Sequence, residues 1–166
     1  FSPNPNKLND IYLHEKGDYC NFYGTIYPSK LTLISNDNPT YSKVFDNIVM
    51  GTEALSGTTN INTDTWKEVR VYNDYQNSDF QLLDPLSLTP NIKRKERSWQ
   101  LAIPRNRVKY TNSANPNIFT DLETSNKLFG ERIRDKYITL DLNYDNLNNY
   151  KLKTHFIKTI YRISDR

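Results

Sequence analysis

Residues 137–144 read Tyr-Ile-Thr-Leu-Asp-Leu-Asn-Tyr, and this stretch carries the strongest structural pattern in the sequence. Its apolar positions from Ile138 to Tyr144 alternate with the polar residues Thr139, Asp141 and Asn143. Because successive side chains of an extended chain point to opposite faces, the alternation puts the apolar side chains on one face and the polar ones on the other. We therefore predict a β-strand with one buried face over 137–144.

The residues that follow predict a partner for this strand. Residues 145–149 read Asp-Asn-Leu-Asn-Asn, which is typical of a turn because Asn and Asp tolerate positive φ and bond nearby backbone groups. In residues 150–163, the spacing of Leu152, Phe156 and Ile160 would put their side chains on the same face of a strand. The order of strand, Asn-rich turn and strand predicts an antiparallel hairpin of 137–144 with 150–163. A lone hairpin is marginal in water, so earlier strands must supply a second layer.

Composition and the upstream pattern favour the same fold class. The sequence has 12 Tyr, 7 Phe and 2 Trp but few Ala, which favours pleated structure over helix. We predict an all-β, antiparallel β-sandwich-like domain with long Asn-rich loops and little helix. The expected upstream elements are a hairpin over 11–23 around Gly17, strands near 31–34, 44–50, 66–75, 80–83 and 98–103, and one short helix at 119–128.

The N-terminal residues differ from the rest of the chain. Residues 1–10 hold Pro3, Pro5 and three Asn, and we interpret them as an extended arm preceding a β-rich domain over 11–166. The sequence begins at Phe1 rather than at Met, which we interpret as an engineered segment, a processed product or an ordered fragment of a longer protein. No apolar run approaches the ~20 residues of a membrane-spanning helix, and the net charge of +3 is too small to indicate nucleic-acid binding by itself.

Few residues carry the chemistry that catalysis or metal binding requires. Nothing in the spacing of His14 and His155 predicts a shared metal. Cys20 is the single cysteine, and we expect a buried and unreactive thiol. Asp141 is explained as a solvated outer-face residue and Asp145 as the first residue of the turn, although a shared cation site is conceivable. We therefore predict a protein that is not an enzyme and has no metal or cofactor.

Two short basic strips are the candidate interface. They are Lys93, Arg94, Lys95 and Arg97 in the first strip, and Arg132, Arg134 and Lys136 in the second. Glu96 interrupts the first strip, and such strips more often form a solvated or salt-bridging face than a nucleic-acid site. We expect both strips to face a partner or a lumen. A single-stranded nucleic-acid site near 93–110, with Trp99 and Tyr110 stacking on bases, is an alternative.

Several segments together resemble a known family. They read YCNFYG at 19–24 with YPS at 27–29, KVFDNI at 43–48, VYNDYQ at 71–76 and RIRDKY at 132–137. In this order they are similar to the C-terminal part of the tail nozzle, or muzzle, proteins of crAss-like tailed bacteriophages, which are also called stabilisation proteins. The resemblance spans most of the chain, although no single motif in it is diagnostic.

The resemblance implies a structural role in the virion tail. It implies a ring of copies of the same protein that contacts other phage tail proteins and gates the passage of genome and cargo proteins, with transient contact to DNA or cargo in the tail lumen. It implies no catalytic residues. A carbohydrate-binding or adhesive β-sandwich is a further alternative, which a cluster of exposed aromatic side chains would favour.

Overall fold

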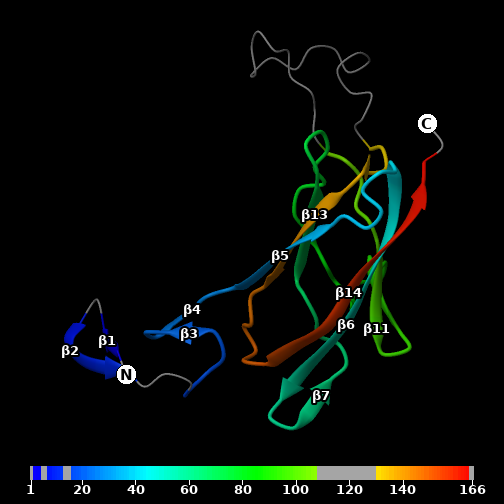
Figure 1. The fold of residues 1–166 in the computed structure, drawn as a ribbon. Helices are drawn as coiled ribbons and strands as arrows, with labels where there is room; N and C mark the ends of the chain where they lie inside the picture. Colours follow the sequence, from blue (N-terminus) through cyan, green and yellow to red (C-terminus); the bar gives the residue numbers. More distant parts are fainter. Residues whose placement is uncertain (1, 5–6, 13–15, 108–129, 165–166) are drawn as a thin grey trace.

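The computed structural model describes residues 2–4, 7–12, 16–107 and 130–164, and every regular element in these ranges is a β-strand (Figure 1). Two antiparallel sheets lie face to face and enclose one apolar core. The prediction of an all-β, sandwich-like fold is therefore confirmed. The short helix predicted at 119–128 lies outside the described residues.

The larger sheet is built around one long strand, β6 (Lys43–Ser56). One edge of β6 pairs along almost its whole length with β14 (Lys151–Ile163). The other edge pairs in turn with three short strands, β12 (Arg134–Asp135), β11 (Ser98–Ala102) and β7 (Thr59–Ile61). Strand β10 (Ile92–Lys95) extends the sheet beyond β11.

The smaller sheet has the order β5 (Ser29–Ser35), β13 (Ile138–Tyr144), β8 (Glu68–Tyr72) and β9 (Gln81–Leu82). Its outer face is polar and internally bonded, because Asp141 on β13 accepts a hydrogen bond from Thr32 on β5 and forms an ion pair with Arg70 on β8. Asp141 is thus paired within the sheet rather than solvated as we predicted.

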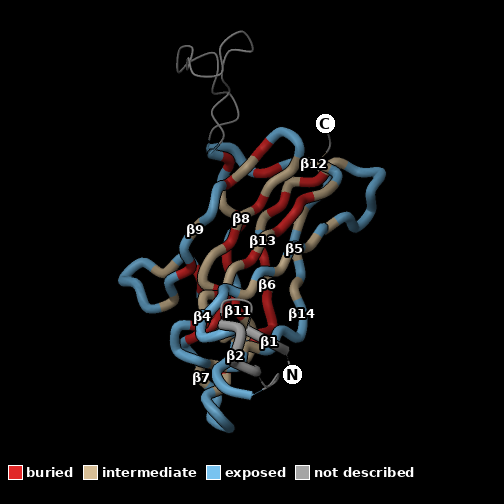
Figure 2. The backbone as a smooth tube through the Cα atoms, turned by 90° about the vertical axis from the view of Figure 1, so that its left-hand side faces the viewer, coloured by how far each residue is buried: buried red, intermediate tan, exposed pale blue. Residues whose placement is uncertain are grey.

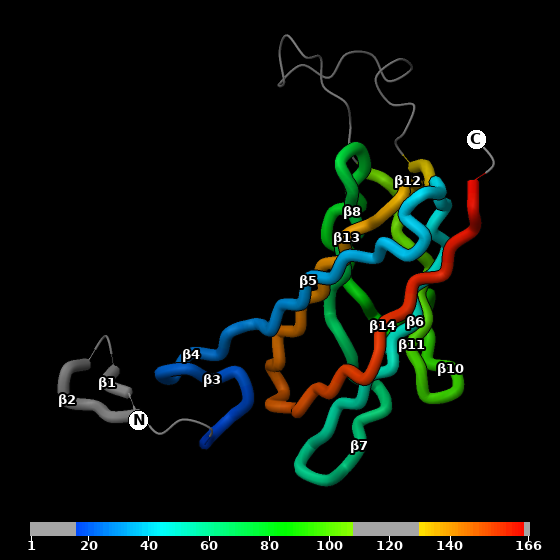
Figure 3. Tube along the Cα trace, viewed as in Figure 1, coloured from blue at the N-terminus to red at the C-terminus, as the bar shows by residue number. Residues whose placement is uncertain are grey.

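The predicted hairpin of 137–144 with 150–163 is wrong, although both segments are strands. Strand β13 pairs with β5 on one edge and with β8 on the other, while β14 pairs with β6 in the opposite sheet. Residues 145–150 therefore form an arch that carries the chain from one sheet to the other (Figure 3). A hairpin turn and an arch share the same local sequence pattern, and here the occupied edges of β13 exclude the hairpin.

The side-chain directions in β14 also differ from the prediction. A β-bulge at His155 shifts the register between Thr154 and Phe156, which reverses the faces that follow it. As a result Phe156 and Ile160 lie on the outer face and are 50% and 41% exposed. Leu152, Ile157 and Tyr161 pack against the core instead.

The N-terminal pairing differs from the hairpin predicted over 11–23. Strand β1 (Ser2–Asn4) pairs with β2 (Lys7–Tyr12), and β3 (Asn21–Phe22) pairs with β4 (Thr25–Ile26). The turn that closes the second hairpin is therefore at 23–24 and not at Gly17. The division of the chain into an arm over 1–10 and a domain over 11–166 stays a prediction.

The core forms where the two sheets face each other, and buried positions alternate along β6, β8 and β13 (Figure 2). It contains apolar residues from both sheets and from the loops between them: Phe45, Ile48, Met50, Trp66, Val69, Val71, Leu83, Ile92, Trp99, Leu101, Ile103, Ile133, Ile138, Leu140, Leu142 and Tyr144. Two aromatic members, Trp66 and Tyr144, pack edge to face with ring centroids 6.4 Å apart.

Candidate interaction surfaces

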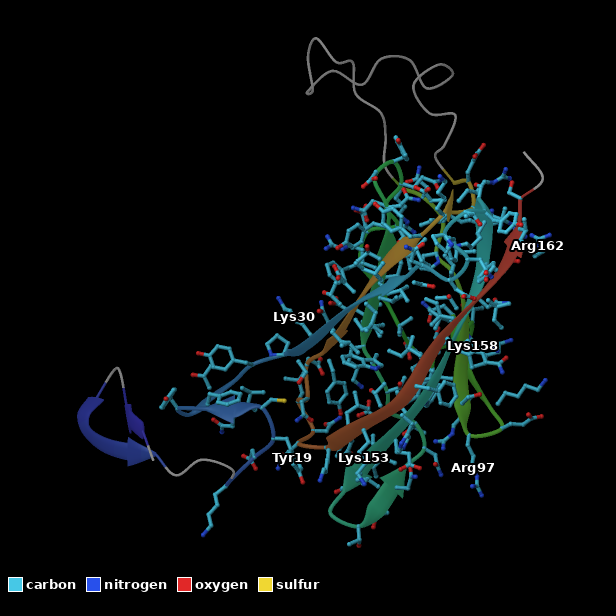
Figure 4. All side chains as sticks on the ribbon, in the orientation of Figure 1. Tyr19, Lys30, Arg97, Lys153, Lys158 and Arg162 are labelled. Carbon is cyan, nitrogen blue, oxygen red and sulfur yellow. The ribbon has the colours of Figure 1, made fainter. Side chains whose placement is uncertain are left out.

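The β3–β4 hairpin projects from the sandwich and exposes aromatic side chains (Figures 1 and 4). Its two-residue turn consists of Tyr23 and Gly24, both with positive φ, as a type I′ turn requires. We call the exposed apolar side chains of this region the aromatic hairpin cluster, and its members are Tyr19, Phe22, Tyr23, Ile26 and Tyr27. Exposed apolar patches of this kind mark interaction sites in soluble proteins.

The base of the hairpin is fixed to the arch between β13 and β14. The backbone N–H of Tyr19 donates to Asn149 Oδ1 over 2.7 Å, and Asn146 Nδ2 donates to the carbonyl oxygen of Tyr19 over 3.2 Å. Asn149 Nδ2 also donates to Asp18 Oδ1 over 2.6 Å. The arch therefore holds the start of the hairpin at a defined place on the sandwich while its tip remains exposed.

The first basic strip lies on the β10–β11 hairpin, whose turn residues Glu96 and Arg97 both have positive φ. Lys93, Lys95 and Arg97 are exposed, so three of the four predicted cations are available to a partner. Arg94 is not, because its guanidinium lies 5.7 Å from the ring centroid of Trp99 and donates to the carbonyl oxygen of Asn62.

The second basic strip is held mainly by its backbone. The backbone of Arg132 and Arg134 bonds to the buried Gln76, and the carbonyl oxygen of Lys136 accepts a hydrogen bond from the buried Lys43. The side chain of Arg132 forms an ion pair with Asp46. Within this strip, Arg134 and Lys136 are therefore the exposed cations without a described carboxylate partner.

The structure does not bring the two strips together. The first pairs through β11 with β6 near Met50, whereas β12 of the second pairs with Lys43 and Val44 at the start of β6. At ~3.3 Å per residue these positions are about 20 Å apart. The two strips are separate surfaces.

The residues considered for catalysis and metal binding do not assemble into a site. Cys20 is half-buried rather than buried as predicted, and its Sγ lies 3.1 Å from Ser29 Oγ. His155 is exposed and lies 3.3 Å from Glu53, while His14 lies outside the described residues. Within the described ranges, no three His, Cys, Asp or Glu residues gather closely enough to hold a metal ion. No helix in those ranges is long and apolar enough to cross a membrane.

Sequence reasoning missed two features of the surface. It interpreted residues 19–23 as one strand of a hairpin but not as an exposed aromatic cluster. It also placed Phe156 and Ile160 inside, so it missed the outer row of β14, where Lys153, Lys158 and Arg162 are exposed (Figure 4). The alternation of Phe156, Lys158, Ile160 and Arg162 is the signal that indicates this row.

These features define a β-sandwich domain with a projecting aromatic hairpin and scattered basic surfaces, a class of domain suited to assembly with other chains. The model of the Crassvirus muzzle protein C-terminal domain family matches residues 17–106, more than half of the chain. The chain belongs to this family, and it is therefore part of a structural protein of the phage virion, in the tail.

A known muzzle protein is also similar to this chain. The muzzle protein of Bacteroides phage crAss001 is 28% identical over 89 residues, which cover 54% of this chain and 6% of that protein. The chain thus corresponds to a small part of the length of this relative. The matched family region includes the aromatic hairpin, β6 and both strands of the β10–β11 hairpin.

Proposed function

We propose that this domain packs against neighbouring subunits in the muzzle assembly of a tailed phage and has no catalytic role. The observation that carries the proposal is the aromatic hairpin cluster, in which Phe22 and Tyr27 are 57% and 53% exposed. Aromatic side chains are enriched in the buried centres of protein interfaces. We therefore expect these rings to be buried against the surface of a neighbouring subunit.

Membership of the family supports a proposal about the partners. We propose that other copies of the same protein, arranged in a ring, and other tail proteins contact this domain. The exposed cations Lys93, Lys95, Arg97, Arg134 and Lys136 face those partners or the lumen, where they are available for transient contact with DNA or cargo proteins. In that setting the domain helps to gate the passage of the genome and cargo.

Imaging of intact virions by cryo-electron microscopy tests the proposal. The domain is expected to bury more than the ~1,000 Å² of total surface that a specific interface requires, with the rings of Phe22 and Tyr27 inside it. The double variant Phe22→Ser, Tyr27→Ser in the full protein is expected to reduce ring assembly in sedimentation velocity. The matched control is Tyr41→Ser, because Tyr41 is equally exposed at 54% but lies in the loop before β6.

Virions in which these rings face open solvent on every copy would contradict the proposal. So would normal assembly of the Phe22→Ser, Tyr27→Ser variant, provided that urea denaturation shows an unchanged domain stability.

The two alternative functions find less support. The rings of Phe22 and Tyr27 are tilted by 58° with centroids 6.2 Å apart, so they do not form one flat platform for a sugar ring. Trp99, the ring expected to stack on bases, is 2% exposed and lies beneath Arg94. Tyr110 lies outside the described residues.

A further inference from the structure

A cleft of about 680 Å³ is lined partly by the outer face of the six-stranded sheet and partly by the core residues Val69, Leu83 and Leu101. Its apolar floor includes Val49 from β6, Ala102 from β11 and Ile160 from β14. The cleft continues to Ile103, just beyond the last residue of β11 that pairs with β10. The floor residues Val49, Ala102 and Ile160 belong to neither the aromatic hairpin nor the core, whereas Ile103 is a core residue.

A neighbouring depression of about 590 Å³ joins this cleft, because both are lined by Asn47, Ala102, Ile103, Arg105 and Ile160. We call the combined feature the outer cleft. Its floor runs across β14, β6 and β11, so it is long enough to take an extended segment of chain rather than a single side chain.

The charge on the rim of the outer cleft is predominantly positive. Lys93, Arg105 and Arg107 line one part, and none of them is paired with a carboxylate among the described residues. Arg132 and Arg162 line the other part.

Among the described residues, Asp46 is the one acidic residue that lines the outer cleft, and it is already paired with two arginines. It forms ion pairs with both Arg132 and Arg162. The hydrogen bond from Arg162 and the charges of the two arginines hold the pKa of Asp46 below its usual value, so this carboxylate stays ionised and bound to them. Within the described part of the chain, the rim therefore presents an excess of positive charge beside an apolar floor.

This combination favours a polypeptide over single-stranded nucleic acid. Proteins that bind single strands place exposed aromatic rings under the bases. The one aromatic residue that lines the outer cleft in the described part of the chain is Phe45, which is 2% exposed and cannot stack. An extended peptide instead presents alternate side chains to opposite sides, so that apolar groups reach the floor and acidic groups reach the rim.

We propose that the outer cleft binds an extended segment of another protein in which acidic and apolar side chains alternate. Electrostatic complementarity with Lys93 and Arg105 sets the specificity for acidic residues, and Val49, Ala102 and Ile160 hold the apolar ones. The inference uses residues outside the aromatic hairpin cluster and does not depend on how copies of the domain assemble.

The test uses the 166-residue chain and a short fluorescent peptide in which glutamates alternate with leucine and valine. Fluorescence anisotropy is expected to show saturable binding that weakens with added salt. The double variant Lys93→Ala, Arg105→Ala is expected to bind roughly tenfold more weakly, as loss of about 1.4 kcal/mol would give. Ala102→Glu, which adds a negative charge on the floor at an exposed position, is expected to abolish binding.

The control variant Lys16→Ala, Lys30→Ala removes the same charge from exposed positions outside the outer cleft, and it is expected to bind like the unmodified chain. Several results would overturn the proposal. They are absence of saturable binding, an equal loss in the control variant, equal binding of a peptide with glutamine in place of glutamate, and full competition by oligothymidylate at the peptide's own concentration.

Discussion

Tyr144 is buried in the sandwich and also forms a polar contact. Its ring is 2% exposed, and its hydroxyl donates to Asp64 Oδ2 over 2.7 Å. Burial, followed by this hydrogen bond, raises the pKa of Tyr144 well above its usual value. The hydroxyl therefore remains a donor throughout the neutral and moderately alkaline range, and Asp64 depends on it together with Lys67.

Removing that hydroxyl tests the contact directly. Tyr144→Phe keeps the ring but leaves the buried Asp64 carboxylate with one partner fewer, and we expect a loss of about 1–3 kcal/mol in the free energy of unfolding. Urea denaturation followed by fluorescence measures the change. Tyr41→Phe, at a site that is 54% exposed, is the matched control and is expected to change stability by less than ~0.5 kcal/mol. Equal stability of the two variants would show that the contact contributes nothing.

Gly51 is required by the aromatic side chain beside it. Gly51 on β6 pairs with Phe156 on β14, and a Cβ at position 51 would overlap the Phe156 ring. We expect Gly51→Ala to destabilise the fold by roughly 1–3 kcal/mol, the usual cost of overpacking. In the background of Phe156→Ala the same substitution is expected to cost much less, because the overlapping ring is gone.

A double-mutant cycle in urea measures this coupling between positions 51 and 156. Additive effects of the two substitutions would mean that the backbone, and not the ring, requires glycine there.

At the scale of elements, the arch between β13 and β14 connects the two sheets of the sandwich. Asn146 is 2% exposed, has a φ of 47°, accepts a hydrogen bond from the N–H of Tyr150 and donates to the carbonyl of Tyr19. Asparagine suits this position because it tolerates positive φ and can bond on both sides. The same residue thus shapes the arch and anchors the aromatic hairpin.

Two substitutions at Asn146 separate these contributions. Asn146→Ala loses both hydrogen bonds and strains the backbone, and we expect a cost of about 2–4 kcal/mol. Asn146→Gly loses the bonds without the strain, so its stability is expected to lie between those of Asn146→Ala and the unmodified chain. Urea denaturation ranks the three proteins, and limited proteolysis near Tyr19 reports the anchoring. A glycine variant less stable than the alanine variant would contradict this account.

The same element shows what a sequence can and cannot predict. The alternation over 137–144 identifies β13 because one of its faces is buried and the other polar, which is local information. Its pairing is not local: β5 and β8 occupy both of its edges, so β14 must pair elsewhere. The bulge at His155 is equally invisible in the sequence, and it reverses which of Phe156 and Ile157 faces the core.

The candidate interface was predictable to a similar extent. The sequence identifies the cations of the two strips, but their availability depends on partners distant in sequence. Arg94 lies over Trp99, and Arg132 binds Asp46, which is 86 residues away. The exposure of the aromatic hairpin likewise depends on where the sandwich ends, which no local pattern specifies.

At the scale of the whole molecule, Asp46 connects three parts of the chain, namely β6, the segment before β12 and the end of β14. Its lowered pKa, due first to the hydrogen bond from Arg162, means that the folded state holds its proton less tightly than the unfolded state does. The stabilisation is therefore present above the unfolded pKa of ~3.9 and is lost as the pH falls through the lower folded pKa.

We expect Asp46→Asn to flatten the acidic limb of the stability profile. The difference in the free energy of unfolding between the unmodified chain and the variant should be largest near neutral pH and should shrink as the pH falls from about 5 to 2. Urea denaturation across this range measures it, with Asp79→Asn, at an exposed position, as the control. A difference that grows toward low pH would reverse the sign and contradict the assignment.

The pairing of β6 with β14 also decides when this domain can fold. Residues roughly 100 positions apart must meet before the largest ladder exists, and contacts of such separation slow folding. During synthesis β6 is complete long before β14 emerges from the ribosome. The edge of β6 that pairs with β14 is therefore exposed in the meantime and can promote aggregation. We expect refolding after dilution from urea to take milliseconds to seconds, as stopped-flow fluorescence can measure. A chain ending at residue 150 should fail to reach the native state and aggregate.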